Sequence, residues 1–162
     1  MLQLLKINVG KYAMKIYTII AGVDGVGKSS LFGILSREVK NLGRTFITTL
    51  SGHRILNTVK RAMEKDYYIR LYYVGLNTVE ESLVRIQNRV KKGGHNIPDA
   101  DVKRRFNKRF EDLTTILQYC DEATFYDNEN GFAAVAEYKN GEILQIGNLK
   151  PEWLNELLEY MV

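Results

Sequence analysis

A glycine-rich stretch between an apolar run and a helix-patterned segment constrains this chain more than any other feature. Residues 22–29, Gly-Val-Asp-Gly-Val-Gly-Lys-Ser, fit the pattern Gly-x-x-x-x-Gly-Lys-Ser/Thr. The preceding run, residues 15–20, is apolar and β-branched, as in a buried parallel strand, and Leu31, Ile34 and Leu35 then recur at helical spacing. A strand, a glycine-rich turn and a helix in this order predict a loop that binds phosphate groups.

The residue types of this loop indicate how it would hold a nucleotide. Glycines let successive backbone N–H groups converge on phosphate oxygens, and the following helix adds the positive end of its dipole. We expect Lys28 to reach the β- and γ-phosphates of ATP or GTP and Ser29 to place its hydroxyl on Mg²⁺. A glycine-rich turn without a ligand is the alternative, but the strand and helix context favours nucleotide binding. The residues expected at the nucleotide are Gly22, Val23, Asp24, Gly25, Val26, Gly27, Lys28, Ser29 and Ser30.

Length and composition favour a single domain over residues 1–162. With 162 residues, 45% of them hydrophobic, the chain can form one core. Its one cysteine, Cys120, cannot form an internal disulfide, which indicates a reduced, cytoplasmic protein. Residues 1–13 precede the first predicted strand as an N-terminal arm and lack the features of a signal peptide. We expect no membrane-spanning segment, because no apolar run is long enough.

Strand and helix patterns alternate through most of the chain. Residues 131–162 then change character: Asn140-Gly141 between two strand-like runs predicts a hairpin, and Pro151 opens a terminal amphipathic helix. The predicted fold class is α/β, a P-loop NTPase-like, mainly parallel sheet flanked by helices, with a C-terminal β-hairpin and terminal helix. The predicted strands are 15–20, 45–50, 67–74 and 123–127. The first three predicted helices are 28–39, one that is capped by Ser51 and runs to 65, and one that has a capping box at 77–80 and ends at Gly93. A single further helix is predicted beyond Pro98, with one face formed by Val102, Phe106, Phe110, Leu113 and Leu117.

Basic residues concentrate in residues 91–109. This segment holds seven Lys and Arg against two Asp, a net charge of +5, within a chain whose net charge is +4. A Gly-Gly joint leads into a helix on which Arg105 and Arg109 share a face, an arrangement typical of a lid that brings arginines to a transferring γ-phosphoryl group. A solvated helix face and a nucleic-acid patch are the alternatives. Nucleic acid is disfavoured because Phe106 and Phe110 are better used in the core than in base stacking.

Several short blocks, in order over residues 15–130, resemble the zeta-toxin-like P-loop kinases, in particular small bacterial proteins described as predicted ATPases. Together the blocks are far more specific than the glycine-rich loop alone. They are residues 21–30, 48–52 (Thr-Thr-Leu-Ser-Gly), 71–76 (Leu-Tyr-Tyr-Val-Gly-Leu), 89–90 with 93–95 and 97–98, 104–106 with Arg109, and 126–128 (Tyr-Asp-Asn).

The resemblance implies phosphoryl transfer from ATP or GTP to a small acceptor. UDP-N-acetylglucosamine is the acceptor associated with the toxin members, and an antitoxin protein is a candidate partner. The site residues that the resemblance implies by position are Lys28, Arg104, Arg105 and Arg109 for the phosphates and catalysis, Ser29 for Mg²⁺, and Thr49 and Ser51 for the acceptor.

The chain also departs from that family. Family members carry an extra segment before the Thr-Leu-Ser-Gly strand, and the resemblance implies that an Asn-Ala-Asp-like strand end in this segment supplies the catalytic base. In this chain, residues 31–45 leave no room for that segment. The family's Glu before Thr-Thr-Leu-Ser-Gly is replaced by Ile47. Asp24 and Asp127 are the candidate substitutes for the missing carboxylates. The alternative is that both are structural, Asp24 as a turn residue and Asp127 as a strand terminator. Three hypotheses stay open: a small-molecule kinase, a nucleotide-binding module that has lost transfer, and a nucleic-acid-associated regulator.

Overall fold

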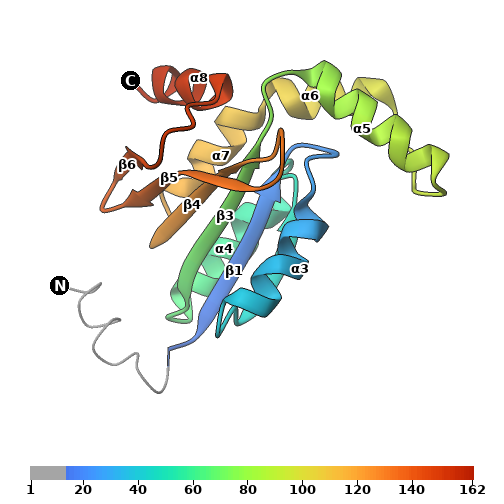
Figure 1. Cartoon of the computed structure of the whole chain (residues 1–162). Helices are drawn as coiled ribbons and strands as arrows, with labels where there is room; N and C mark the ends of the chain where they lie inside the picture. The colour runs from blue at the N-terminus through green and yellow to red at the C-terminus, as the bar shows by residue number, and fades with distance from the viewer. Residues whose placement is uncertain (1–13) are drawn as a thin grey trace.

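The apolar runs form one six-stranded sheet in the computed structural model, which describes residues 14–162 (Figure 1). The strands are β1 (Ile16–Gly22), β2 (Arg44–Thr48), β3 (Tyr68–Gly75), β4 (Glu122–Asp127), β5 (Ala133–Lys139) and β6 (Glu142–Gln145). Their order across the sheet is β2-β1-β3-β4-β5-β6; the first four strands are parallel to one another, and β5 and β6 each pair antiparallel to the strand before them. The predicted mainly parallel sheet with a C-terminal hairpin is confirmed. The arm predicted for residues 1–13 lies outside the described residues.

Helices cover both faces of this sheet. They are α3 (Lys28–Glu38), α4 (Arg54–Glu64), α5 (Val79–Lys91), α6 (Asp99–Asn107), α7 (Arg109–Leu117) and α8 (Glu152–Tyr160). The chain passes from β1 to β2 and then back past β1 to β3, so right-handed crossovers place α3 and α4 on opposite faces. Figure 1 shows α5 and α6 beyond the carboxyl ends of the parallel strands. Within residues 14–162, no helix has the length and apolar character needed to cross a membrane.

The core consists of two clusters, one on each face of the sheet. The first joins α4, α7 and α8 and includes the fully buried Val59, Leu113 and Trp153. The second joins α3 and α6 to the glycine-rich loop, in which Val23 and Val26 are 3% and 0% exposed. The loop is therefore fixed by core packing at two of the four positions that the phosphate-binding pattern leaves free.

The single helix predicted beyond Pro98 is wrong: two helices, α6 and α7, occupy this segment and meet at Lys108. Phe106 packs in the cluster with the loop, whereas Phe110, Leu113 and Leu117 pack in the cluster with α4 and α8. One straight helix cannot place its apolar stripe in cores on opposite faces of a sheet, so the chain changes direction between them.

The C-terminal segment is anchored by one tryptophan. The Trp153 indole N–H donates to Asp127 Oδ1 at 2.8 Å, at the end of β4. A Cβ built on Gly75 would lie 2.2 Å from Trp153 Cδ2, so only glycine lets α8 approach the end of β3 this closely. The hairpin turn has Asn140 and Gly141 at φ 54° and 82°, the left-handed pair of a type I′ turn, as predicted.

Two predicted helix starts are shifted. Ser51 does not cap α4, which begins at Arg54 after His53, because the Ser51 hydroxyl pairs with Thr49 Oγ1 at 2.8 Å. In α5 the cap is Thr78, whose Oγ1 accepts from Glu81 N at 3.2 Å. Asn77 Oδ1 instead accepts from Trp153 N at 3.0 Å, so the helix cap lies one residue later than predicted.

Candidate phosphate-binding site

The glycine-rich loop leaves β1 and enters α3 at the carboxyl edge of the sheet. Gly27, the residue before α3, has φ 101°, a left-handed conformation that favours glycine. A Cβ there would lie 2.9 Å from Asn128 Nδ2, so the loop and the end of β4 approach each other closely. Within the described part of the chain, no side chain caps the start of α3. Its first N–H groups therefore face the loop, where an anion can accept from them.

Lys28 turns its ammonium group back into the loop. Its Nζ donates to the carbonyl oxygens of Gly22 at 3.1 Å and Val23 at 2.9 Å. Burial lowers the pKa of Lys28 to about 8; Asp24 opposes this shift, and Arg89 adds to it. A lysine that burial and neighbouring cations make less basic gains an interaction when a phosphate arrives, because the phosphate supplies the missing negative charge.

Asp24 ties the loop to the two helices beyond the sheet edge. Its carboxylate is 4% exposed and accepts from Arg105 Nη1 of α6 at 3.2 and 3.4 Å. Its backbone carbonyl accepts a hydrogen bond from the Ser82 hydroxyl of α5. Nε of Arg105 is buried and has no partner among residues 14–162. The loop, α5 and α6 thus form one connected unit.

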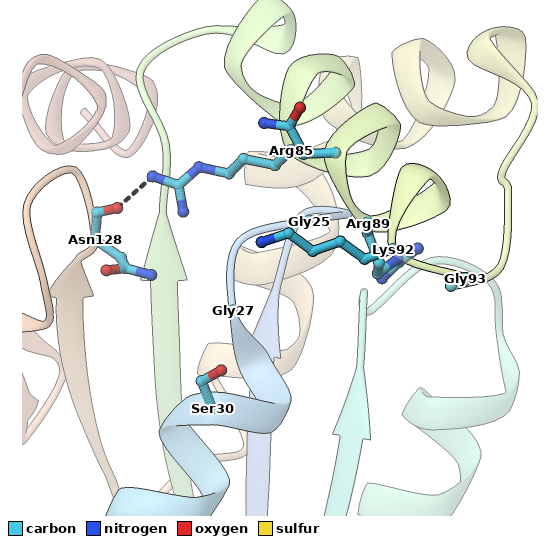
Figure 2. A pocket seen from close by; sticks show the side chains of 10 residues that line it. Gly25, Gly27, Ser30, Arg85, Arg89, Lys92, Gly93 and Asn128 are labelled. Atoms are coloured by element: carbon cyan, nitrogen blue, oxygen red, sulfur yellow. Dashed lines mark hydrogen bonds between the residues drawn. The ribbon is translucent and has the colours of Figure 1, made fainter.

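A cavity of about 640 Å³ opens between this loop and α5. Figure 2 shows Arg85, Arg89 and Lys92 on the α5 side of this cavity, with the Arg85 side chain extending toward Asn128. The Arg85 guanidinium donates to the Asn128 carbonyl, and Asn128 Nδ2 donates to the Val26 carbonyl at 3.0 Å. No carboxylate lines this cavity among the described residues. The complete lining is Gly25, Gly27, Ser30, Arg85, Asn88, Arg89, Lys92, Gly93, Gly94 and Asn128.

Of the three arginines expected at the phosphates, the structure brings only Arg105 to the loop. Arg104 pairs with Asp101 at 2.7 Å on the surface of α6, and its side chain is 62% exposed. Arg109 Nη2 pairs with Glu156 of α8 at 2.8 Å. The Arg109 guanidinium also lies 4.0 and 4.1 Å from the ring centroids of Phe106 and Phe110. Arg109 therefore joins α7 to α8 in this conformation.

The two substitute carboxylates both have structural partners. Asp24 holds Arg105, as described above. Asp127 is 3% exposed, and its oxygens accept from Trp153 Nε1 at 2.8 Å and from Glu129 N at 3.2 Å. Thr49 and Ser51, expected at the acceptor, bond to each other just after β2. They do not line the cavity beside the loop.

Sequence reasoning missed the cationic face of α5 as a site. Arg85, Asn88, Arg89 and Lys92 recur at spacings of three and four residues, which place them on one helix face. That pattern is common to solvated helices, so the spacing alone could not distinguish a binding face from a surface. The signal was the combination with Gly93-Gly94, which ends α5 beside the loop.

Comparison with known proteins shows the fold of this chain. No family model matches the sequence. An uncharacterized protein of Haemophilus influenzae is 39% identical over 88 residues, which are 54% of this chain and 61% of that protein. This chain thus spans about three fifths of that relative.

Two solved structures are similar over 98% of this chain. One is the AvrRxo1-ORF1:-ORF2 complex with ATP, with TM-score 0.62, 13% identity and 66% of that chain covered. The other is from the PezAT chromosomal toxin-antitoxin system of Streptococcus pneumoniae, with TM-score 0.56, 12% identity and 91% of that chain covered. The chain therefore shares the fold of these two structures, and at these identities the likeness concerns the fold alone.

Proposed function

We propose that this protein binds ATP or GTP with Mg²⁺ at the loop of residues 22–29 and transfers the γ-phosphoryl group to a small-molecule acceptor. One observation carries the nucleotide proposal. The Lys28 ammonium lies inside the loop and donates to two backbone carbonyls, beside a cavity of about 640 Å³ that is lined by three cationic side chains from α5 and its C-cap residue. An AvrRxo1 complex with this fold was solved with ATP, which adds support. A cytoplasmic location, where both nucleotides and a buried free Cys120 are stable, belongs to the same proposal.

Different residues of the protein would contact different phosphate groups of the nucleotide. The start of α3 would donate backbone N–H groups to phosphate oxygens, and Lys28 would leave the loop carbonyls for the β- and γ-phosphates. The cationic side chains of α5 would neutralise the remaining charge. Ser29 would hold Mg²⁺ through its hydroxyl, and the bound ion would balance charge that develops on the β- and γ-oxygens.

Titration calorimetry with Mg-ATP and Mg-GTP tests nucleotide binding. Lys28→Ala should weaken binding at least about a hundredfold, because it removes a buried charge-assisted contact. Lys60→Ala is the matched control, since Lys60 is on α4 and its ammonium lies over the Tyr119 ring, away from the loop. Equal affinities for wild type and Lys28→Ala would refute the site.

A nucleotide-binding module without transfer is the second candidate. It is favoured because Asp24 and Asp127, the carboxylates that could replace the family's missing ones, are engaged by Arg105 and Trp153. Incubation with γ-labelled ATP and UDP-N-acetylglucosamine or smaller acceptors distinguishes the two candidates. A labelled product that Lys28→Ala abolishes supports the kinase; tight binding without product supports the module.

An antitoxin protein is the proposed macromolecular partner. The support is that a structure similar over 98% of this chain belongs to a toxin-antitoxin system. Co-expression with the neighbouring gene, followed by affinity purification of the full chain, tests it. A stable complex that blocks Mg-ATP binding is the expected result, whereas a neighbouring product that never co-purifies would count against the proposal.

A further inference from the structure

A second cavity, of about 190 Å³, lies between the start of α4 and α7. Leu50, Ile55 and Ile116 form its apolar part and belong to the core cluster on the α4 face of the sheet. Its polar part comes from His53, which precedes α4, and from the α7 segment. The polar side chains of this lining are His53, Lys108, Glu111, Asp112 and Thr115.

This second cavity is linked to the phosphate loop through the α6–α7 junction. Arg105, on the last turn of α6, binds Asp24 of the loop, and Lys108, one turn further, lines the second cavity. On the strand side, Ala21 pairs with Thr48, so the segment with Leu50 leaves the sheet beside the loop. Both cavities therefore lie near the carboxyl edge of the sheet, where open α/β sheets bind ligands.

The two cavities differ in charge. The first is lined by three cations and, within the described chain, no carboxylate. The second carries Glu111 and Asp112 beside Lys108 and His53. Burial raises the pKa of Asp112, with Lys108 and His53 opposing the shift and Glu111 adding to it. A half-buried carboxylate beside an apolar wall suits a hydroxyl or ammonium group and repels a phosphate.

The two cavities also differ in size. The second, at about 190 Å³, offers the space of about six water molecules and lies below the range of about 300 Å³ and upward found for drug-sized ligands. A single sugar ring approaches this limit. A nucleotide sugar, with a base, two sugar rings and two phosphates, exceeds it and brings the wrong charge.

We propose that the cavity between α4 and α7 is the acceptor subsite, that it takes an uncharged or cationic hydroxyl compound about the size of one sugar ring, and that Asp112 accepts the hydroxyl proton. This proposal rests on the proposed kinase function. In the reaction, the Asp112 carboxylate takes the proton and the acceptor oxygen forms a bond to the γ-phosphorus of ATP. The bond from that phosphorus to the β–γ bridging oxygen breaks, and its electron pair leaves with ADP.

The experiment measures ADP release from Mg-ATP by the full chain with four probes of different size and charge. Glucose and glucosamine match the second cavity; glucose 6-phosphate and UDP-N-acetylglucosamine do not. We expect glucose or glucosamine to raise ADP release at least tenfold over the rate without acceptor and to yield a sugar phosphate by mass spectrometry. Stimulation by either anionic probe, or by none of the four, overturns the proposal.

Three variants assign the role of Asp112. Asp112→Asn should lower the stimulated rate at least about a hundredfold, the usual contribution of a general base, and leave Mg-ATP affinity unchanged. Asp112→Glu should recover part of the rate. Glu64→Gln, at the exposed end of α4, is the matched control and should keep the full rate. A stimulated rate retained by Asp112→Asn would overturn the assignment.

A cavity-filling variant keeps the proposal testable if Asp112→Asn fails to fold. Thr115→Trp, in the second cavity, should raise the KM for glucose or glucosamine at least tenfold with Mg-ATP affinity intact, and an unchanged KM overturns the subsite. Failure of this inference is distinct from failure of the proposed function, because the calorimetric titration with Mg-ATP needs no acceptor.

Discussion

Arg105 and Arg109 lie four residues apart and bind carboxylates in different regions of the molecule. Arg105 of α6 binds Asp24, which is 4% exposed within the phosphate loop. Arg109 of α7 binds Glu156 of α8, whose side chain is 47% exposed, and stacks between two phenyl rings. The break at Lys108 therefore turns Arg105 toward the loop and Arg109 toward α8. Neighbouring residues of one basic segment can thus belong to a site and to its support.

Replacing Arg105 should give the largest effect on both stability and ligand binding. Arg105→Ala leaves Asp24 buried without its partner, so the free energy of unfolding should fall by about 3 kcal/mol, the lower end of the range because Arg105 is 29% exposed. Urea denaturation measures this loss, and calorimetry should show weakened Mg-ATP binding. The double variant Asp24→Asn with Arg105→Ala should recover much of the stability, because the buried charge is gone. A double variant as unstable as Arg105→Ala would contradict this account.

Replacing Arg109 should affect stability alone. Arg109→Ala removes the guanidinium between Phe106 and Phe110 and its 2.9 Å hydrogen bond to the Phe106 carbonyl, while Glu156 stays hydrated. We expect the free energy of unfolding to fall by about 2 kcal/mol. Mg-ATP affinity, measured well below the melting temperature, should match wild type. A tenfold loss of that affinity would mean that Arg109 moves to the phosphates when nucleotide binds, and the distinction between Arg105 and Arg109 would fail.

Because the pKa of Lys28 is lowered, a rise in pH should increase the stability of the protein and decrease its affinity for Mg-ATP. Because its pKa is about 8 in the folded protein against 10.5 ordinarily, the unfolded chain binds more protons between these values, and stability rises with pH there. Between pH 8 and 9 the Lys28 contribution should raise the free energy of unfolding of the nucleotide-free protein by about 1 kcal/mol. Mg-ATP affinity should fall over the same interval, as the ammonium loses its proton. Lys28→Met is the control, and a variant with the same pH dependence as wild type would exclude Lys28 as its source.

Replacing Arg104 should give the smallest effect. The Arg104–Asp101 pair lies at the surface, with the Arg104 side chain 62% exposed, so Arg104→Ala should change the free energy of unfolding by less than about 0.5 kcal/mol. Mg-ATP turnover should also stay within twofold of wild type. A large loss of turnover would mean that Arg104 takes part in the reaction and that a second arginine of residues 91–109, besides Arg105, acts at the loop.

Local patterns predicted the fold well where a single element carried the signal. The strands before the loop and at residues 67–74 lie within one or two residues of β1 and β3, and the Asn140-Gly141 turn closes the hairpin as expected. The apolar stripe from Val102 to Leu117 misled because helical spacing reports which residues are buried, without reporting which face of the sheet buries them. The sequence predicted that the loop belongs to the candidate site. It did not predict the contact between Asn128 and the loop, because Asn128 and Val26 are 102 positions apart in the sequence.

By itself, the sequence predicted where the glycine-rich loop lies, because the constraint is local: glycines, Lys28 and a helix start must follow one strand within a few residues. Only the tertiary structure decided which cations face that loop. The crossovers bring α5 over the loop and turn α7 toward α8, so Arg85 and Arg89 line the cavity while Arg109 binds Glu156. The physical reason is that a charged side chain's role depends on the carboxylate, phosphate or water that it meets, and chain spacing does not specify that partner.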